Sequence, residues 1–212
     1  MQILLNVLTF LSVFICLLYY LKNRNKNGVF YFFCYLLAIV LIDYAAGIIL
    51  KNGGTTLILY NCLIFLEFNF LFLFFIQIVS RKSSLQIIKL SLILFNFTYV
   101  LSIFYYGFKN IYLIYNAISA LLGSALVGCI CVIYLREFLL SDKVINYKKD
   151  VTFWFTIGLL IYYIGGMPFT AIINYMKEMP EVIDLFLIMN GLTIFMHICF
   201  IIGFIWSWKE VK

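Results

Sequence analysis

The sequence predicts an all-α membrane protein, a polytopic bundle of seven transmembrane helices with the N-terminus outside and the C-terminus in the cytoplasm. Apolar residues make up 66% of the 212 residues and charged residues only 11%, which lies far from the composition of soluble domains. The charged residues gather in short breaks between seven apolar runs. Each run is near or above the roughly 20 residues that a helix needs to cross the hydrocarbon of a bilayer.

The runs take up the chain from residue 1 to residue 212 as a single transmembrane domain. We therefore expect no soluble catalytic or DNA-binding domain in it. The net charge of +6 is modest and is explained by lysines that face anionic lipid headgroups, so membrane lipids are expected partners and nucleic acid is not. The predicted helices cover residues 2–21, 28–50, 57–79, 87–106, 111–135, 151–175 and 185–208.

The basic residues predict the orientation. The first, third and fifth breaks and the C-terminal tail hold twelve of the fifteen Lys and Arg residues, and the other breaks hold only Lys51, Lys109 and Lys177. Because the side of a membrane protein richer in Lys and Arg faces the cytoplasm, the N-terminus is predicted outside. The first run carries its positive charges after it rather than before it, so we interpret it as a retained helix and not a cleaved signal peptide.

Two carboxylates interrupt the apolar runs, and they flank the short polar turn from Lys51 to Thr56. Asp43 lies in the run before the turn and Glu67 in the run after it. A charge in hydrocarbon costs several kcal/mol unless it is neutralised, so acidic residues at such positions point to function. Other polar residues lie at similar positions along the predicted helices.

Converting helix position to depth places these polar residues in two layers. The outer layer lies about 6 to 10 Å below the outer surface, and it contains Asp43, Asn61, Asn116 and Asn190. The deeper layer lies at about 15 to 17 Å, near the midplane, and it contains Glu67, Asn96 and His197.

Several of these residues share a helix face. Asn190, Thr193 and His197 follow each other at i, i+3 and i+7, which makes one stripe. The third and fifth runs carry similar polar stripes, the fifth formed by Tyr112, Tyr115, Asn116, Ser119 and Gly123. If the stripes face inward, they enclose an outward-opening pocket with Glu67 and His197 at its floor. The candidate ligand-pocket residues are Asp43, Asn61, Glu67, Asn96, Asn116, Asn190, Thr193 and His197. The alternative is that they only form hydrogen bonds between helices.

His197 is the only histidine, and no Lys or Arg lies deep enough to neutralise Glu67. A protonated histidine beside a carboxylate keeps both groups charged, so these two residues are a candidate pair, and the alternative is a neutral Glu67. In the sixth run, Pro168 removes a backbone hydrogen bond and is a candidate hinge, although a static kink is the alternative.

The sequence lacks the residues that several known kinds of cofactor and metal site require. The last run has no lysine in its middle, which excludes a retinal pigment bound as a Schiff base. Asp43, Glu67 and His197 differ in depth, so a zinc site of three protein ligands is not predicted. No phosphate-binding glycine-rich loop is present. We therefore predict neither a cofactor nor a metal, and the catalytic residues of any enzyme activity are unknown.

The stretch from Trp154 to Gly165, WFTIGLLIYYIG, resembles one found in small seven-helix membrane proteins of Bacteroidota. Some of these are similar to the membrane sensor portions that precede histidine kinases. The resemblance implies a multi-pass protein of the bacterial inner membrane with a sensor or accessory role. Since no kinase domain follows Lys212, it also implies a separate signalling partner on the cytoplasmic side.

Three functions remain open from the sequence. The first is a receptor-like or sensor protein whose outward-opening pocket binds a small or amphiphilic ligand. The second is a membrane-embedded lipid-modifying enzyme with Glu67 or Asp43 as acid or base and His197 as its partner. The third is a small proton-coupled transporter with Glu67 as the protonated site. The chain shows no internal sequence repeat, which disfavours a transporter.

Overall fold

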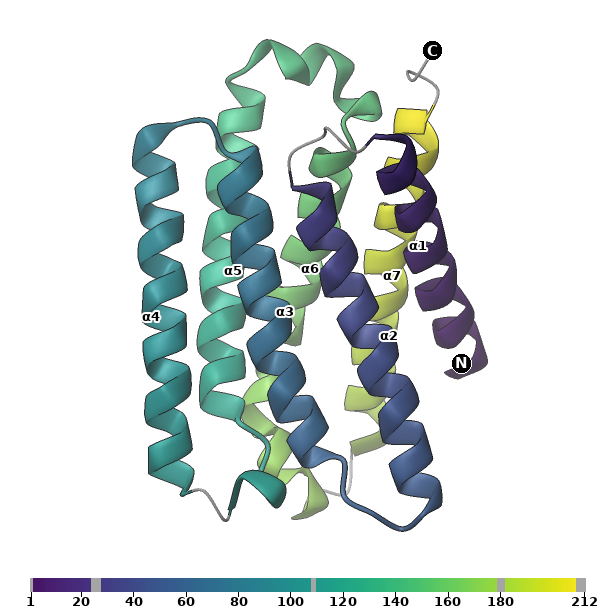
Figure 1. Ribbon diagram of the computed structural model, residues 1–212, viewed down its shortest axis with the longest axis vertical. Helices are drawn as coiled ribbons and strands as arrows, with labels where there is room; N and C mark the ends of the chain where they lie inside the picture. The colour runs from purple at the N-terminus through teal and green to yellow at the C-terminus, as the bar shows by residue number, and fades with distance from the viewer. Residues whose placement is uncertain (1, 24–27, 108–109, 179–181, 209–212) are drawn as a thin grey trace.

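The computed structural model describes residues 2–23, 28–107, 110–178 and 182–208, and in these ranges the chain contains helices and no strand. Seven of the helices are long and apolar enough to span a membrane, which confirms the predicted all-α bundle (Figure 1). The spanning helices are α1 (Gln2–Lys22), α2 (Val29–Lys51), α3 (Leu57–Ile78), α4 (Lys82–Tyr106), α5 (Ala117–Leu139), α6 (Val151–Ile172) and α7 (Val182–Trp208). Three 3₁₀ segments join them, namely η1 (Asn110–Tyr112), η2 (Asp142–Lys149) and η3 (Ile173–Glu178).

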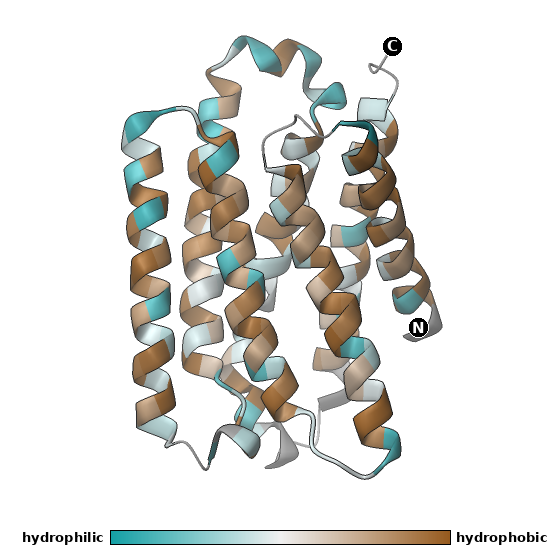
Figure 2. Cartoon of the chain, viewed as in Figure 1, coloured by the Kyte–Doolittle hydropathy of each residue, from teal (hydrophilic) through white to brown (hydrophobic). Residues whose placement is uncertain are grey.

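The helices form a closed ring. Each spanning helix packs against the next one in the chain, and α1 packs against α7, which closes the ring. Helix α3 also contacts α5, so it lies toward the middle of the bundle. Figure 2 shows apolar residues along most of each helix and polar residues gathered at the helix ends, with a few polar positions between them.

The two ends of the bundle differ. At one end, lowest in Figure 1, α2 turns into α3 and the 3₁₀ segments η1 and η3 lie; we call it the α2–α3 end. At the other, α3 turns into α4 and η2 joins α5 to α6; we call it the η2 end.

The starts of α4 and α5 lie farthest from the predicted residues, and they differ in opposite directions. Helix α4 begins at Lys82 rather than residue 87, and the hydroxyl of Ser84 in its first turn donates a hydrogen bond to Glu137 of α5. Helix α5 begins at Ala117 rather than residue 111 because the side-chain oxygen of Asn116 caps it, accepting a hydrogen bond from the backbone N–H of Ser119 at 3.2 Å.

The later start of α5 has a consequence for the predicted stripe. Tyr112 and Tyr115 precede the helix, so they do not share a helical face with Ser119 as the sequence suggested. The predicted sixth helix likewise ends at Ile172, and the chain continues as η3 instead of reaching residue 175 in α-helical form.

An aromatic core fills the bundle toward the η2 end. Phe32 of α2 stacks on Phe155 of α6 with ring centroids 3.8 Å apart, and it meets Phe200 of α7 edge-on at 5.0 Å. Phe74 of α3 completes the contact at 5.3 Å, and all four side chains are fully buried. Since lipid tails are as apolar as these rings, the gain comes from close packing of the rings against each other.

Candidate functional site

Between the aromatic core and the α2–α3 end, the bundle encloses a polar chamber of about 300 Å³. This is the lower limit of the volumes usual for small-ligand sites. Helices α1, α2, α3, α6 and α7 and the segment before α5 contribute its walls. The residues that line the polar chamber are Leu5, Asn6, Thr9, Tyr35, Ile39, Asp43, Tyr60, Leu63, Ile64, Glu67, Tyr115, Tyr162, Asn190, Thr193, Met196 and His197.

Five of the eight predicted pocket residues line this one chamber: Asp43, Glu67, Asn190, Thr193 and His197. They come from α2, α3 and α7, so the stripe predicted on the last helix faces inward.

Glu67 lies in the wall of the chamber without a hydrogen-bonding partner in the part of the chain that the structure describes. Its side chain is mostly covered, and a second hollow of about 50 Å³ lies on its other side, lined by Tyr115, Tyr162 and Thr170 among others. A carboxylate removed from water is costly unless a cation or hydrogen-bond donors compensate it. Glu67 is therefore an acidic group of the chamber whose hydrogen-bonding capacity the described residues leave unused.

His197 is held by α1 and not by Glu67. Its Nδ1 lies 3.0 Å from the hydroxyl of Ser12 and its Nε2 lies 3.3 Å from the hydroxyl of Thr9. The side chain is only 1% exposed. Because both ring nitrogens already have partners, the predicted direct pair of Glu67 and His197 is not formed, although both residues line the same chamber. His197 instead joins α7 to α1.

Asp43 lies at the boundary between the chamber and the outside of the bundle. The hydroxyl of Tyr60 donates a hydrogen bond to its Oδ1 at 3.4 Å. Asp43 also lines a second cavity of about 250 Å³ between α1 and α2, which Lys51 lines as well. We call this cavity the α1–α2 groove.

Three predicted pocket residues serve other contacts. Asn61 of α3 donates to the backbone oxygen of Ile114 at 3.0 Å and accepts from the backbone N–H of Asn116 at 2.8 Å. The side chain of Asn116 donates to Ser102 at 2.7 Å. These bonds tie α3, α4 and the start of α5 together, and neither asparagine lines the chamber.

Asn96 lies on a face of α4 that meets α3. Its amide group donates to Asn69 at 2.9 Å, and Asn69 donates back at 3.3 Å. The prediction failed here because depth alone does not give the direction of a side chain around the helix axis. The sequence alternative, a hydrogen bond between helices, describes Asn96 correctly.

The asparagine cluster leads to a stability prediction. Replacing Asn61 by Ala should lower the free energy of unfolding by about 1 to 3 kcal/mol, because the backbone groups of Ile114 and Asn116 lose their hydrogen bonds to its side chain. The control is Asn69→Ala, which removes the amide pair with Asn96 and should cost less, about 0.6 to 1.7 kcal/mol. Unfolding titrations in mixed micelles measure both. A smaller loss for Asn61→Ala than for Asn69→Ala would contradict this role.

The prediction missed α1 altogether. Asn6, Thr9 and Ser12 lie at spacing three and face the chamber or His197. Their spacing was a usable signal, but Thr9 and Ser12 also bond to their own backbone four residues earlier, at 2.9 and 2.8 Å. Hydroxyls in helices commonly make that bond, which is why they attract little attention in a sequence.

Pro168 lies inside α6 without ending it, since the helix continues to Ile172. Gly166 and Thr170, on either side of it in the chain, line the small hollow behind Glu67. The candidate hinge therefore lies next to the chamber wall. Among the described residues, no group of three His, Cys, Asp or Glu side chains is placed to hold a metal ion.

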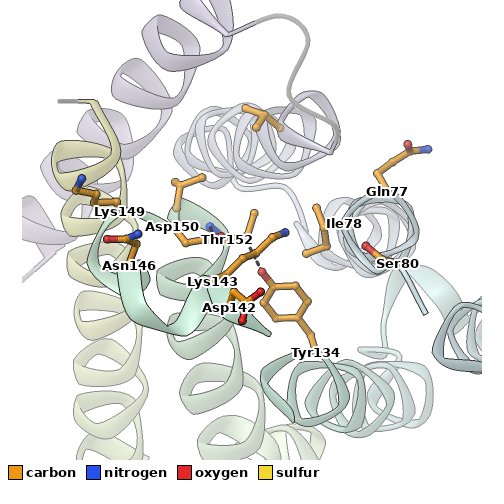
Figure 3. A pocket seen from close by; sticks show the side chains of 12 residues that line it. Gln77, Ile78, Ser80, Tyr134, Asp142, Lys143, Asn146, Lys149, Asp150 and Thr152 are labelled. Carbon is orange, nitrogen blue, oxygen red and sulfur yellow. Dashed lines mark hydrogen bonds between the residues drawn. The ribbon is translucent and has the colours of Figure 1, made fainter. Parts of the chain in front are cut away.

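A separate hollow of about 660 Å³, larger than the polar chamber, lies at the η2 end. Figure 3 shows the side chains of Asp142, Lys143 and Thr152 gathered around Tyr134. The hydroxyl of Tyr134 is hydrogen-bonded to that of Thr152, and the backbone N–H of Thr152 donates to Asp150 at 2.9 Å. The start of α6 is thus fixed to α5 beside a mostly polar hollow.

Searches against protein-family models, curated proteins and solved structures find no match to this chain.

Proposed function

We propose that this integral membrane protein is a receptor-like or sensor protein that binds a small or amphiphilic ligand in the polar chamber. The observation that carries the proposal is Glu67, a carboxyl group without a hydrogen-bonding partner among the described residues, in the wall of a ligand-sized cavity. A bound ligand would supply the partner that the protein does not.

Helix α6 is the proposed route of the signal. Tyr162 lines the polar chamber, and Val151 and Thr152 at the start of the same helix line the hollow at the η2 end. A ligand that shifts α6, with Pro168 as the hinge, would change the segment from Arg136 to Asp150. We propose that a signalling partner on the cytoplasmic side reads this segment, whose η2 portion carries Lys143, Lys148 and Lys149.

The proposal requires the η2 end to face the cytoplasm of a bacterial inner membrane. We therefore expect green fluorescent protein fused after Lys212 to fluoresce in bacterial cells, and alkaline phosphatase at the same position to be inactive. Alkaline phosphatase fused in the turn between α2 and α3, after Gly54, should be active. The reverse pattern of activities would place the polar chamber at the cytoplasmic end and overturn an outward-opening receptor.

Ligand binding itself is tested with protein taken directly from native membranes. The protein is extracted with its surrounding lipid, and the retained small molecules are identified by mass spectrometry. We expect at least one molecule that is enriched with the wild-type chain and lost from a Glu67→Gln variant of equal expression. Identical molecules in both preparations, together with no thermal stabilisation by a broad panel of amphiphiles, would overturn the proposal.

A further inference from the structure

The charge of the polar chamber favours a cation. Two carboxylates line it, Asp43 and Glu67, while none of the Lys and Arg side chains that the structure describes does. His197 does not compensate them by direct contact, since both of its ring nitrogens meet hydroxyls of α1. An anionic or purely apolar occupant would leave these carboxylates without a counter-charge.

Aromatic rings add to the same preference. Tyr35, Tyr60, Tyr115 and Tyr162 line the chamber from α2, α3, the segment before α5, and α6. The faces of aromatic rings attract cations, and quaternary ammonium groups are commonly recognised by several aromatic rings together with a carboxylate nearby. An ammonium group is held by charge and ring faces without needing hydrogen-bond acceptors at fixed angles.

The α1–α2 groove indicates that the ligand also has an apolar part. It shares Asn6, Thr9 and Asp43 with the chamber, so the two cavities adjoin there. Its other walls are mostly apolar: Phe10, Val40, Tyr44, Gly47 and Ile48, with Lys51 also present. A shallow apolar surface continues from it along α1, formed by Val7, Phe10, Leu11 and Phe14.

These apolar residues face the lipid. Phe10 is 55% exposed, Tyr44 68% and Ile48 46% in the isolated protein. In a spanning helix such exposure means contact with acyl chains. The groove is therefore a lateral connection between the polar chamber and the hydrocarbon of the bilayer.

The geometry points to a single-chain amphiphile with an ammonium head as the ligand. Its head lies in the polar chamber between Glu67 and the tyrosine rings, and its alkyl chain leaves through the α1–α2 groove past Gly47 into the lipid. This inference rests on the proposed function, since it names the ligand class of the same chamber.

The test uses the full chain in lipid nanodiscs and radiolabelled decyltrimethylammonium as the probe. We expect saturable binding that unlabelled decyltrimethylammonium displaces, and at least about tenfold weaker competition by decanol or decyl sulfate, which lack the cation. Equal competition by decyl sulfate would overturn the cationic head. Displacement of the probe only by a neutral or anionic molecule retained from native membranes would also overturn it, while leaving the proposed function intact.

Gly47 offers a direct test of the groove. A Cβ added at Gly47 meets no atom within 4 Å, so Gly47→Leu should fold normally and fill the groove. We expect about tenfold weaker binding of decyltrimethylammonium, because an overfilled site typically costs 1 kcal/mol or more. Tetramethylammonium, which has no chain, should bind equally to both proteins.

The matched control is Gly191→Leu on α7, where an added Cβ also meets nothing within 4 Å and where the residue lies outside both cavities. This variant should bind decyltrimethylammonium as the wild type does. Unchanged binding of the long-chain probe by Gly47→Leu would overturn the groove as the path of the chain. An equal loss of tetramethylammonium binding would do the same, because it would show that the substitution disturbs the chamber itself.

Discussion

Glu67→Gln should weaken the binding of an ammonium ligand by about 100-fold, which corresponds to about 2.7 kcal/mol. Glutamine keeps the shape of the side chain but removes the charge that faces the cation. Truncating one partner of a buried charge pair typically costs at least 2 kcal/mol, because the other charge remains buried without its counter-charge. The effect should appear as a higher dissociation constant of decyltrimethylammonium in nanodiscs.

The same substitution should leave the fold intact. The Glu67 carboxyl group makes no hydrogen bond within the described part of the protein, so glutamine removes no contact that holds helices together. Equal expression and an unchanged unfolding midpoint are expected. A loss of binding combined with a loss of folded protein would instead assign Glu67 a structural role.

Glu137→Gln is the matched control for charge. Glu137 of α5 accepts a hydrogen bond from Ser84 of α4 and does not line the polar chamber. Its replacement changes the net charge by the same amount at a different place, and binding should stay within about twofold of the wild type, since unrelated surface changes rarely exceed 0.5 kcal/mol. If Glu67→Gln and Glu137→Gln had equal effects, a specific role of Glu67 in the chamber would be contradicted.

Much of the fold was predictable because a bilayer imposes a strict length on each apolar run. All seven spans were located from this rule, but the start of a helix can lie on either side of the start of its apolar run. Helix α4 begins earlier than predicted, in a polar first turn at Lys82, and α5 begins later than predicted, after its cap Asn116. Hydropathy marks where hydrocarbon begins and does not mark where a helix begins.

The candidate site was only partly predictable, because depth is one coordinate and direction around the helix axis is another. Glu67 and His197 share a depth and both line the polar chamber, yet His197 turns its ring nitrogens to α1. Asn96 shares the same depth and meets Asn69 instead. Directions of this kind follow from which helices are neighbours: the packing of α1 against α7 decides the contacts of His197, and the packing of α3 against α4 decides those of Asn96.

The two halves of this closed ring are filled differently, and this difference explains why the chamber can stay open. The interior toward the η2 end is filled by fully buried aromatic rings, while the interior toward the α2–α3 end is lined by tyrosines, asparagines and two carboxylates. His197 lies at the boundary, with its ring 5.7 Å from that of Phe200. The packed half fixes the helices, and the other half keeps a cavity that a ligand can enter.

Phe32→Ala should therefore cause the largest loss of stability, about 3 to 5 kcal/mol in the free energy of unfolding. The ring of Phe32 contacts three helices besides its own, through Phe74, Phe155 and Phe200. Removing it opens a void that the neighbouring rings fill only in part, and each of them loses close contacts. The cost does not depend on transfer from water, since packing itself stabilises helices inside a bilayer.

Phe30→Ala is the matched control, because it makes the same change on the same helix where the ring is 49% exposed. We expect its unfolding midpoint to lie close to that of the wild type in a titration with denaturing detergent, while the midpoint of Phe32→Ala falls clearly. Binding of decyltrimethylammonium to the folded fraction of Phe32→Ala should also weaken, because the floor of the chamber rests on the aromatic core. Equal stability of the two variants would contradict a rigid aromatic half that holds the polar chamber open.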